Sequence, residues 1–222
     1  QGGSGDDLYA FEAGCGSDTV VELSGDGSDT MPFLTLGTPL QITIGSVEVR
    51  DTIGNLVNHS GDDIEDVIGG QGDNVVVFEN GAALANSTGT ITGGAGTDTL
   101  DYSNYTTLIG INLGTSSATG LAGFSSFESV IGSQSNQDEI VGDSNANVFR
   151  ITGNDAGVVN DAFLFSAIEN ATGSTGDDTF LFEGLVFCPY LQLGLWGSEN
   201  SLRIEATKEG CHEEEVCGSP HG

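Results

Sequence analysis

Apolar residues alternate with polar ones in short runs through much of the chain. Leu40, Ile42 and Ile44 stand at every second position, and Ile109 and Ile111 repeat the pattern. A period of two places successive side chains on opposite faces of an extended strand, so each run predicts a strand with one buried face. No long apolar stripe with the 3.6-residue period of a helix occurs, so we expect little helix. The pattern predicts an all-β chain.

Glycine-rich turns that share one pattern separate these runs. The segment Gly2-Gly3-Ser4-Gly5-Asp6-Asp7-Leu8-Tyr9-Ala10 has the form G-G-x-G-x-D-x-U-x, where U is a large apolar residue. The pattern returns in residues 13–21 and 24–31, with the aspartates spaced eleven residues apart. Three tandem copies in one register indicate a true repeat.

Further copies follow with decreasing fidelity. Residues 93–100 match fully, and residues 173–180 carry one serine in place of a glycine. Residues 69–76 and 142–149 have asparagine where aspartate is expected, at positions 74 and 147. Residues 132–140 keep the aspartate and the apolar residue but lack the inner glycines. Because asparagine supplies only a neutral oxygen, a bound ion is less expected at the turns of Asn74 and Asn147 than at the aspartate turns.

Glycine and aspartate in this arrangement suit a calcium ion. Ca²⁺ takes six to eight oxygen ligands at about 2.3–2.6 Å. Glycine allows the positive φ that directs turn carbonyls inward, and aspartate adds the negative charge. The predicted metal-binding residues are Gly3, Gly5, Asp7, Gly14, Gly16, Asp18, Gly25, Gly27, Asp29, Gly70, Gly72, Asn74, Gly94, Gly96, Asp98, Asp138, Gly176 and Asp178.

On these turns the chain resembles the RTX, or haemolysin-type, calcium-binding repeat region of large secreted and cell-surface bacterial proteins. The resemblance covers residues 1 to about 183. It implies a right-handed parallel β-solenoid, also called a β-roll or β-helix, with Ca²⁺ between successive coils. It also implies an extracellular location.

A second repeated phrase predicts the length of one coil. It joins an apolar residue to glutamate ahead of three of the turns, in residues 64–70, 127–133 and 168–174. The copies begin 63 and 41 residues apart, close to multiples of about 21, a usual solenoid repeat length. We therefore expect coils of about 20–24 residues.

The turn residues support the same length. From Asp7 through Asp29, Asp51 and Asn74 to Asp98, the sequence positions advance by 22, 22, 23 and 24 in turn. Two later steps, to 138 and 178, are nearly twice as long, which predicts extra coils near 118 and 158. Asp7 and Asp29 should stack on one edge, with Asp18 on the opposite edge. The side chains expected to point inward are Leu8 or its neighbour Tyr9, then Val20, Val76, Leu100, Ile140, Phe149 and Phe180.

The charge of the chain limits its partners. The formal net charge is −29, with only four basic residues among 222. Direct binding to nucleic acid or to anionic membranes is therefore not expected. An acidic surface like that of salt-adapted proteins is the alternative explanation, but the aspartates concentrate in glycine-rich turns. No apolar run is long enough for a transmembrane helix.

Three regions follow from these patterns: tandem repeats in 1–34, a solenoid with degenerate turns in 35–183, and a C-terminal cap or docking segment in 184–222. A poorly ordered tail beyond about 208 is the alternative for the last. Cys188, Cys211 and Cys217 fall in this region. The extracellular context favours a disulfide among them, while free thiols and a metal site remain alternatives.

Catalytic motifs are absent from the sequence. Neither G-x-S-x-G nor H-E-x-x-H occurs, and the residues at 143–147 do not complete an EF-hand. Paired acids such as Asp177-Asp178 are interpreted as ligands or solvated neighbours, not as a general acid and base. The threonines at 88, 90 and 92 resemble a calcium-dependent ice-binding array, but the array is not sustained. We therefore expect no enzymatic activity.

Two functions of different class remain. The first is a calcium-rigidified structural rod in a surface fibre, surface layer or adhesin stalk. The second is a calcium-dependent secretion or folding appendage of an RTX enzyme or toxin. The chain opens inside a repeat, so we expect a segment of a longer polypeptide or a processed chain. Its first strand edge should pair with flanking coils, or head-to-tail with another copy.

Overall fold

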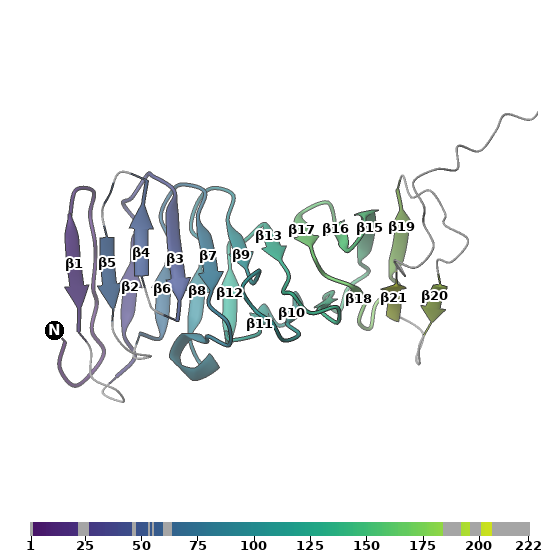
Figure 1. Ribbon diagram of the computed structural model, residues 1–222, viewed down its shortest axis with the longest axis horizontal. Coiled ribbons are helices and arrows are strands. Elements are labelled where there is room, and N and C mark those ends of the chain that lie inside the picture. Colours follow the sequence, from purple (N-terminus) through teal and green to yellow (C-terminus); the bar gives the residue numbers. More distant parts are fainter. Residues whose placement is uncertain are drawn as a thin grey trace, which may run out of the picture.

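The fold is all-β over the part of the chain that the computed structural model describes, which confirms the fold class in its broad form. In that part the one helix is the short 3-10 helix η1 (Leu84–Ser87). The strands lie across the long axis of an elongated body (Figure 1). The described residues are 2–21, 27–45, 48–52, 54, 56–59, 64–183, and the backbones of 192–195 and 201–205.

An eleven-stranded sheet runs the length of the described body; we call it the long sheet. Its central strands β3, β7, β9, β13 and β17 pair in parallel, and antiparallel hairpins flank them on both sides. In spatial order the strands are β1 (Ser17–Val20), β5 (Leu56–His59), β4 (Glu48–Asp51), β3 (Leu40–Ile44), β7 (Val75–Phe78), β9 (Thr99–Asp101), β13 (Ser129–Ile131), β17 (Phe163–Ser166), β16 (Ala156–Val159), β15 (Val148–Gly153) and β19 (Thr179–Phe182).

Two shorter sheets accompany the long sheet. The four-stranded sheet is parallel throughout, in the order β12 (Gly123–Ser125), β8 (Thr90–Thr92), β6 (Asp66–Ile68) and β2 (Thr30–Pro32). The six-stranded sheet is mixed, in the order β11 (Ser117–Ala118), β10 (Gly110–Asn112), β14 (Glu139–Val141), β18 (Asn170–Thr172), β21 (Ser201–Glu205) and β20 (Gln192–Leu195).

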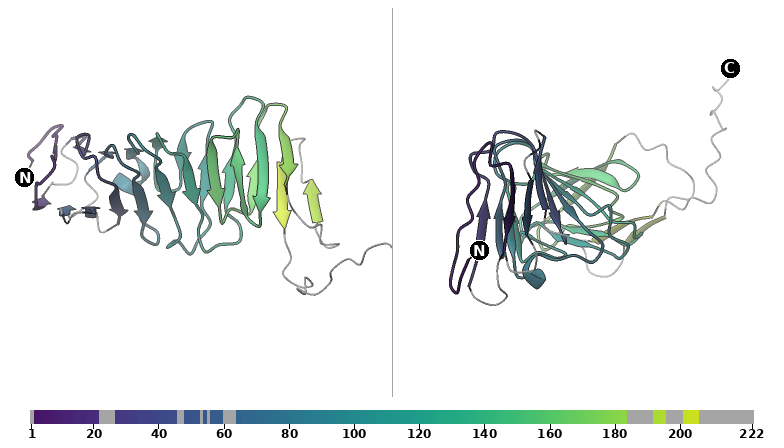
Figure 2. Two further views of the ribbon diagram at one scale, coloured as in Figure 1. Left: turned by 90° about the horizontal axis from the view of Figure 1, so that it is seen from above. Right: turned by 60° about the vertical axis from the view of Figure 1, so that its left-hand side comes forward.

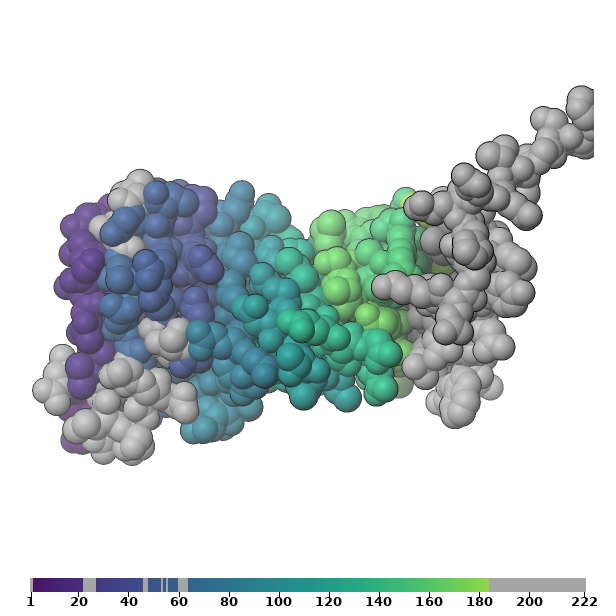
Figure 3. Space-filling model, viewed as in Figure 1, coloured from purple at the N-terminus to yellow at the C-terminus, as the bar shows by residue number. Residues whose placement is uncertain are grey.

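Parallel pairing stacks the chain in layers along the long axis. We use "layer" for a stretch of chain whose strands pair with matching strands before and after it. Successive layers follow one another from the N-terminal end, as the strand arrows and the colour gradient show (Figures 2 and 3). The glycine-rich turns connect strands of different sheets within a layer, for example between β8 and β9. Turns that connect the same two sheets therefore lie above one another.

The prediction of one uniform coil length is wrong for most layers. Thr90 pairs with Asp66, Thr99 pairs with Val75, and an isolated bridge joins Leu8 to Thr30, so these pairings keep the expected length. Elsewhere the step is longer: Thr99 pairs with Ser129, and Ser129 with Leu164. The additional residues form hairpin strands, which lengthen a layer without adding a new one.

The extra coils expected near 118 and 158 are likewise absent among the described residues. Strand β11 pairs antiparallel with β10, and β16 pairs antiparallel with β15 and β17. Asp51 also leaves the predicted series, because it lies in β4, antiparallel to β3. Equal spacing in the sequence therefore does not predict which residues stack in successive layers where a hairpin is inserted.

The core contains most of the side chains that were expected to point inward. Val20, Val76, Leu100, Ile140 and Phe149 are buried, and Phe180 is partly buried against them. At the first turn the inward residue is Tyr9, which packs against the core, and not Leu8, whose side chain is 68% exposed. A phase error of one residue exchanges the two faces of a strand.

The predicted C-terminal region 184–222 is described only in β20 and β21. Their backbones form an antiparallel pair, and β21 continues the six-stranded sheet beside β18. Cys188, Cys211 and Cys217 lie outside the described residues.

Candidate functional site: a ladder of turn carboxylates and amides

Six turn side chains each immediately precede a strand, and we call this set the turn ladder: Asp29, Asn74, Asp98, Asp138, Asn147 and Asp178. Because these strands belong to all three sheets, the set comprises more than one stack. All but Asp178 are almost completely buried. In five of the six, Oδ1 accepts a hydrogen bond from a backbone N–H of another layer, at 2.7–3.0 Å. Asn74 shows both roles, since its Oδ1 accepts from Leu40 and its own N–H donates to Asp98. Each turn residue therefore fastens two layers together.

Three glutamates extend the ladder. Glu65, Glu128 and Glu169 accept the backbone N–H of Asp29, Asp98 and Asp138, at 2.7, 2.7 and 3.0 Å respectively. All three come from the repeated phrase that precedes a turn. The repeated phrase is the sequence signal for these glutamates, but the turn pattern does not predict them as binding residues. In each copy of the phrase, the glutamate carboxylate accepts a hydrogen bond from the backbone N–H of a turn aspartate of the neighbouring layer.

The turn glycines are needed because neighbouring backbones approach closely. Gly94 and Gly96 have φ of +111° and +124°, a region that side chains rarely adopt. A Cβ on Gly96 would lie 2.7 Å from the carbonyl group of Gly72, and a Cβ on Gly94 would overlap the carbonyl oxygen of Gly70. The G-x-G spacing thus serves layer stacking whether or not an ion binds.

The N-terminal turns differ from one another. Asp7 stacks below Asp29 as expected, through the 2.8 Å bond from its N–H to Asp29 Oδ1, and Asp7 Oδ2 accepts from Gly3. Asp18 is exposed on β1 of the long sheet, apart from the ladder. Among the described residues, no atom would contact a Cβ on Gly3, Gly5, Gly14 or Gly16, whereas a Cβ on Gly27 would overlap Gly5. Gly25 lies outside the described residues.

The second polar atom of each later ladder side chain faces the first glycine of its own turn. Relative to a Cβ built on that glycine, Asn74 Nδ2 lies at 3.1 Å, Asp98 Oδ2 at 2.6 Å, Asp138 Oδ2 at 2.9 Å and Asn147 Nδ2 at 2.7 Å. Asp178 Oδ2 has the same orientation toward Gly173. These five atoms therefore occupy equivalent positions.

The partners available at this equivalent position differ. Asn74 and Asn147 donate from Nδ2 to carbonyl oxygens, and Asp138 Oδ2 accepts from the Ser133 N–H at 2.6 Å. Asp98 Oδ2 and Asp178 Oδ2 are buried and have no hydrogen-bond partner within the described residues. A buried oxygen that lacks a donor is costly, so protonation of the carboxyl group or a positive partner would stabilise either turn.

Burial also changes the acidity of two ladder groups. It raises the pKa of Asp98; hydrogen bonds from Asn74 oppose the rise, and the carboxylates of Glu128 and Asp73 add to it. Burial likewise raises the pKa of Glu169, with a further contribution from Asp138. Both shifts report mainly the loss of hydration on burial, with a smaller contribution from neighbouring carboxylates.

The fit to a metal ion is partial. No group of three or more histidine, cysteine or acidic side chains that could hold a metal occurs among the described residues. An ion beside Asp98 would therefore depend on main-chain oxygens for most of its ligands. One such oxygen is present, because the Ser126 carbonyl oxygen and Asp98 Oδ2 both lie close to the Cβ position of Gly93. Carboxylate and carbonyl oxygens are the donors that Ca²⁺ prefers.

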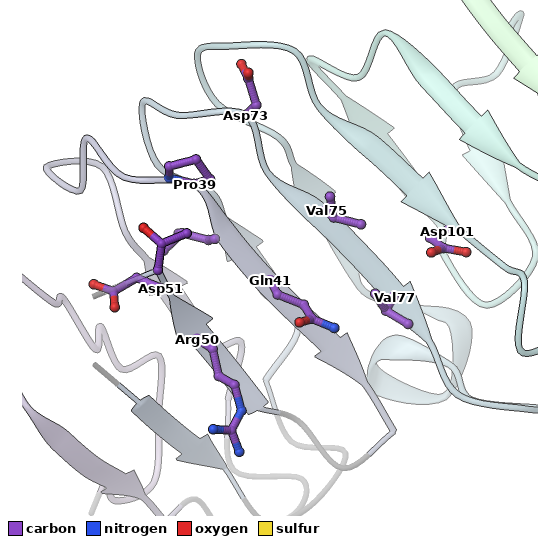
Figure 4. Close-up of a pocket in the computed structure, with 10 residues that line it drawn as sticks. Pro39, Gln41, Arg50, Asp51, Asp73, Val75, Val77 and Asp101 are labelled. Atoms are coloured by element: carbon purple, nitrogen blue, oxygen red, sulfur yellow. The ribbon is translucent and has the colours of Figure 1, made fainter. Parts of the chain in front are cut away.

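A separate hollow of about 430 Å³ lies on the outer face of the long sheet, over β3, β4, β7 and β9 (Figure 4). Gln41 and Arg50 line it beside the aliphatic side chains of Val75 and Val77. Arg50 forms an ion pair with Glu48. The hollow is also lined by Asp51 and by Asp73, an exposed neighbour of Asn74, but by none of the six ladder residues.

Comparison of the sequence with models of protein families gave no match, and comparison with curated proteins gave none either. Across the described residues, no helix has the length and apolar character needed to cross a membrane. The turn ladder and its stacking geometry are therefore the basis for any inference about function.

Proposed function

We propose that this chain is a calcium-binding extracellular structural protein, an RTX-type β-solenoid rod that calcium stiffens. The observation that carries the proposal is the pair of buried carboxyl oxygens, Asp98 Oδ2 and Asp178 Oδ2, that have no donor among the described residues. Both belong to the turns of the later chain that keep the repeat pattern best. Where the pattern has decayed, at Asn74, Asp138 and Asn147, a protein group serves instead.

A divalent cation suits this position on chemical grounds. A buried carboxylate is stable when it is paired, protonated or bound to a metal. Ca²⁺ accepts irregular cages of carboxylate and carbonyl oxygens, whereas Mg²⁺ requires nearly ideal octahedral geometry and gives up its water reluctantly. The net charge of −29 adds a general reason, because bound cations reduce the self-repulsion of the folded chain.

The strand pairing supports the solenoid part of the proposal. Matching strands of successive layers pair in parallel in all three sheets, and turn residues stack on turn residues. Parallel strands joined by crossover connections are right-handed in nearly all proteins, so we propose a right-handed coil. The exposed strand edges and the repeated structure suit a rod more than a compact enzyme.

The test is thermal unfolding of the whole chain in calcium and in chelator, together with calorimetric titration. Calcium at one hundred times its Kd should stabilise the folded state by about 2.7 kcal/mol per independent site, so the Tm should rise by several degrees. Magnesium at the same concentration should have a smaller effect. An unchanged Tm, with no heat of calcium binding, would overturn the proposal.

A pair of variants localises the effect. Asp29→Ala should lower calcium affinity, because Asp29 belongs to the tandem turns and its carboxylate holds the Asp7 N–H. Asp161→Ala is the matched control, since that side chain is 74% exposed and its ion pair with Arg150 is long, at 3.5 Å. Equal affinities of the two variants would contradict an ion at the first turns.

A further inference from the structure

The asparagine turns contain a donor at the position where the aspartate turns lack one. Asn74 is fully buried, and its Nδ2 donates to the Gly93 carbonyl oxygen of the next layer at 2.9 Å. At the equivalent position in the next turn, Asp98 Oδ2 lies near the Ser126 carbonyl oxygen. We call the contact between a turn and the next layer a junction. At the Asn74 junction a donor faces an acceptor. At the Asp98 junction two acceptor oxygens lie near each other, and the described residues place no donor between them.

Asn147 shows how closely an amide nitrogen takes the place of an ion. Its Nδ2 is surrounded by four oxygens from two layers at 2.9–3.0 Å. They are the main-chain oxygens of Asp143, Asn145 and Gly173, and Oδ1 of Asp178. A carboxamide has only two N–H groups, so it cannot satisfy all four. A position with four acceptor oxygens and only two N–H donors resembles the surroundings of a bound cation.

We infer that the side-chain amides of Asn74 and Asn147 occupy the cation position of the turn ladder. The Asn74 and Asn147 junctions are then closed by protein alone, while the Asp98 and Asp178 junctions need an ion. The inference rests on the proposed function for the aspartate turns. It divides the rod into junctions that respond to calcium and junctions that do not.

Exchange of aspartate and asparagine tests this division, because the two side chains have the same shape. Asn147→Asp replaces the donor by a second carboxylate beside Asp178, so the junction repels itself until an ion binds. With calcium, two carboxylates and three carbonyls would offer five oxygens. Asp98→Asn has the opposite effect, since its new N–H₂ group faces the Ser126 carbonyl oxygen.

The experiment measures the number of bound calcium ions by calorimetry and the Tm in chelator for the full chain. Asn147→Asp should gain one ion per chain and lose several degrees of Tm in chelator, most of which calcium restores. Asp98→Asn should lose one ion and keep or raise its Tm in chelator, by roughly 2–4 °C for each kcal/mol gained. Asp161→Asn, which removes the same charge at an exposed site, should keep the wild-type number of ions.

Other results would overturn the inference. They are an Asn147→Asp variant that gains no ion, or an Asp98→Asn variant that keeps the wild-type number of ions or melts earlier in chelator. These outcomes are separate from failure of the proposed function, which a wild-type chain without bound calcium would reveal. On this inference, the Tm in chelator falls below the wild-type value for Asn147→Asp and does not fall for Asp98→Asn. This difference is expected whatever the calcium affinity of the wild type.

Discussion

Most ladder residues use their two polar side-chain atoms differently. Oδ1 accepts a backbone N–H from another layer in an asparagine, Asn74, as it does in an aspartate, Asp98. This bond therefore does not distinguish the two residue types. The second atom does, because a carbonyl oxygen of the next layer accepts from an amide and repels a carboxylate. On the proposed function, this second atom and its partners decide whether the contact between two layers is complete without an ion.

Tyr102 offers a test of burial at the residue scale. Its side chain is fully buried, stacks on Phe78 at a centroid distance of 4.2 Å and donates to the Thr119 carbonyl oxygen at 2.7 Å. Burial raises its pKa well above the ordinary value, with a smaller contribution from Tyr105. The folded state therefore holds the phenol proton more tightly than the unfolded state does.

The sign of the pH effect follows from linkage. Below about pH 10 both states keep the proton, so the raised pKa has no effect on stability. Above that pH the unfolded chain ionises while the folded chain cannot, so stability falls as the pH rises. Absorbance of tyrosinate should lag behind that of a denatured control until the protein unfolds. Tyr102→Phe should reduce this alkaline sensitivity and cost about 0.5–1.5 kcal/mol at neutral pH for the lost hydrogen bond.

A normal tyrosine titration would contradict the prediction. If the tyrosinate signal reached its full value near pH 11 while the far-ultraviolet spectrum stayed native, Tyr102 would be accessible to solvent. Tyr105 is expected to follow Tyr102, because burial also raises its pKa.

At the scale of single elements, the turns determine how closely layers approach. The strands are only two to six residues long, so each contributes few hydrogen bonds. The turns add bonds from side chain to backbone in every later layer. Glycine permits this because a Cβ at the stacked positions would enter the neighbouring backbone. Turn composition therefore matters as much to the fold as the apolar runs.

Gly96→Ala measures the contribution of one turn. The new Cβ would lie 2.7 Å from the Gly72 carbonyl group, at a φ of +124°. We expect a loss of ~1–3 kcal/mol from the forced backbone shift, in calcium and in chelator alike. Gly110→Ala is the control, since nothing lies within 4 Å of its Cβ position. Equal urea midpoints for the two variants would show that the turns are not in contact.

At the scale of the whole molecule, the long sheet leaves a strand at each end. Strand β1 pairs with β5, and β19 pairs with β15, and neither has a second partner within the described residues. Unpaired strand edges tend to pair with other chains. The charge of −29 opposes contact between two copies, so association should require a bound cation.

Self-association should therefore depend on calcium. Light scattering or analytical ultracentrifugation at high protein concentration should show larger species in calcium and monomers in chelator, because ions reduce repulsion between acidic rods. Head-to-tail contacts that do not close would give filaments visible by electron microscopy. A monodisperse monomer at high protein and calcium concentrations would contradict this prediction.

The sequence by itself determined the local features. Alternation at Leu40, Ile42 and Ile44 depends only on the two-residue period of a strand, and all three are buried in β3. The turn positions followed from glycine and aspartate chemistry, and the first step of the repeat correctly placed Asp7 beside Asp29. These features are set within a few residues or by one unbroken repeat, so the local pattern contains the necessary information.

Only the tertiary structure decided how the layers meet. Hairpins such as β3–β4 and β15–β16 change the step between paired strands, and they removed Asp51 from the series. The role of Glu128 and the missing partner of Asp98 Oδ2 depend on atoms from a neighbouring layer, distant in the sequence. Hydrogen bonding and burial at the ladder are properties of two layers in contact. The sequence of one turn therefore cannot determine whether its carboxylate is satisfied.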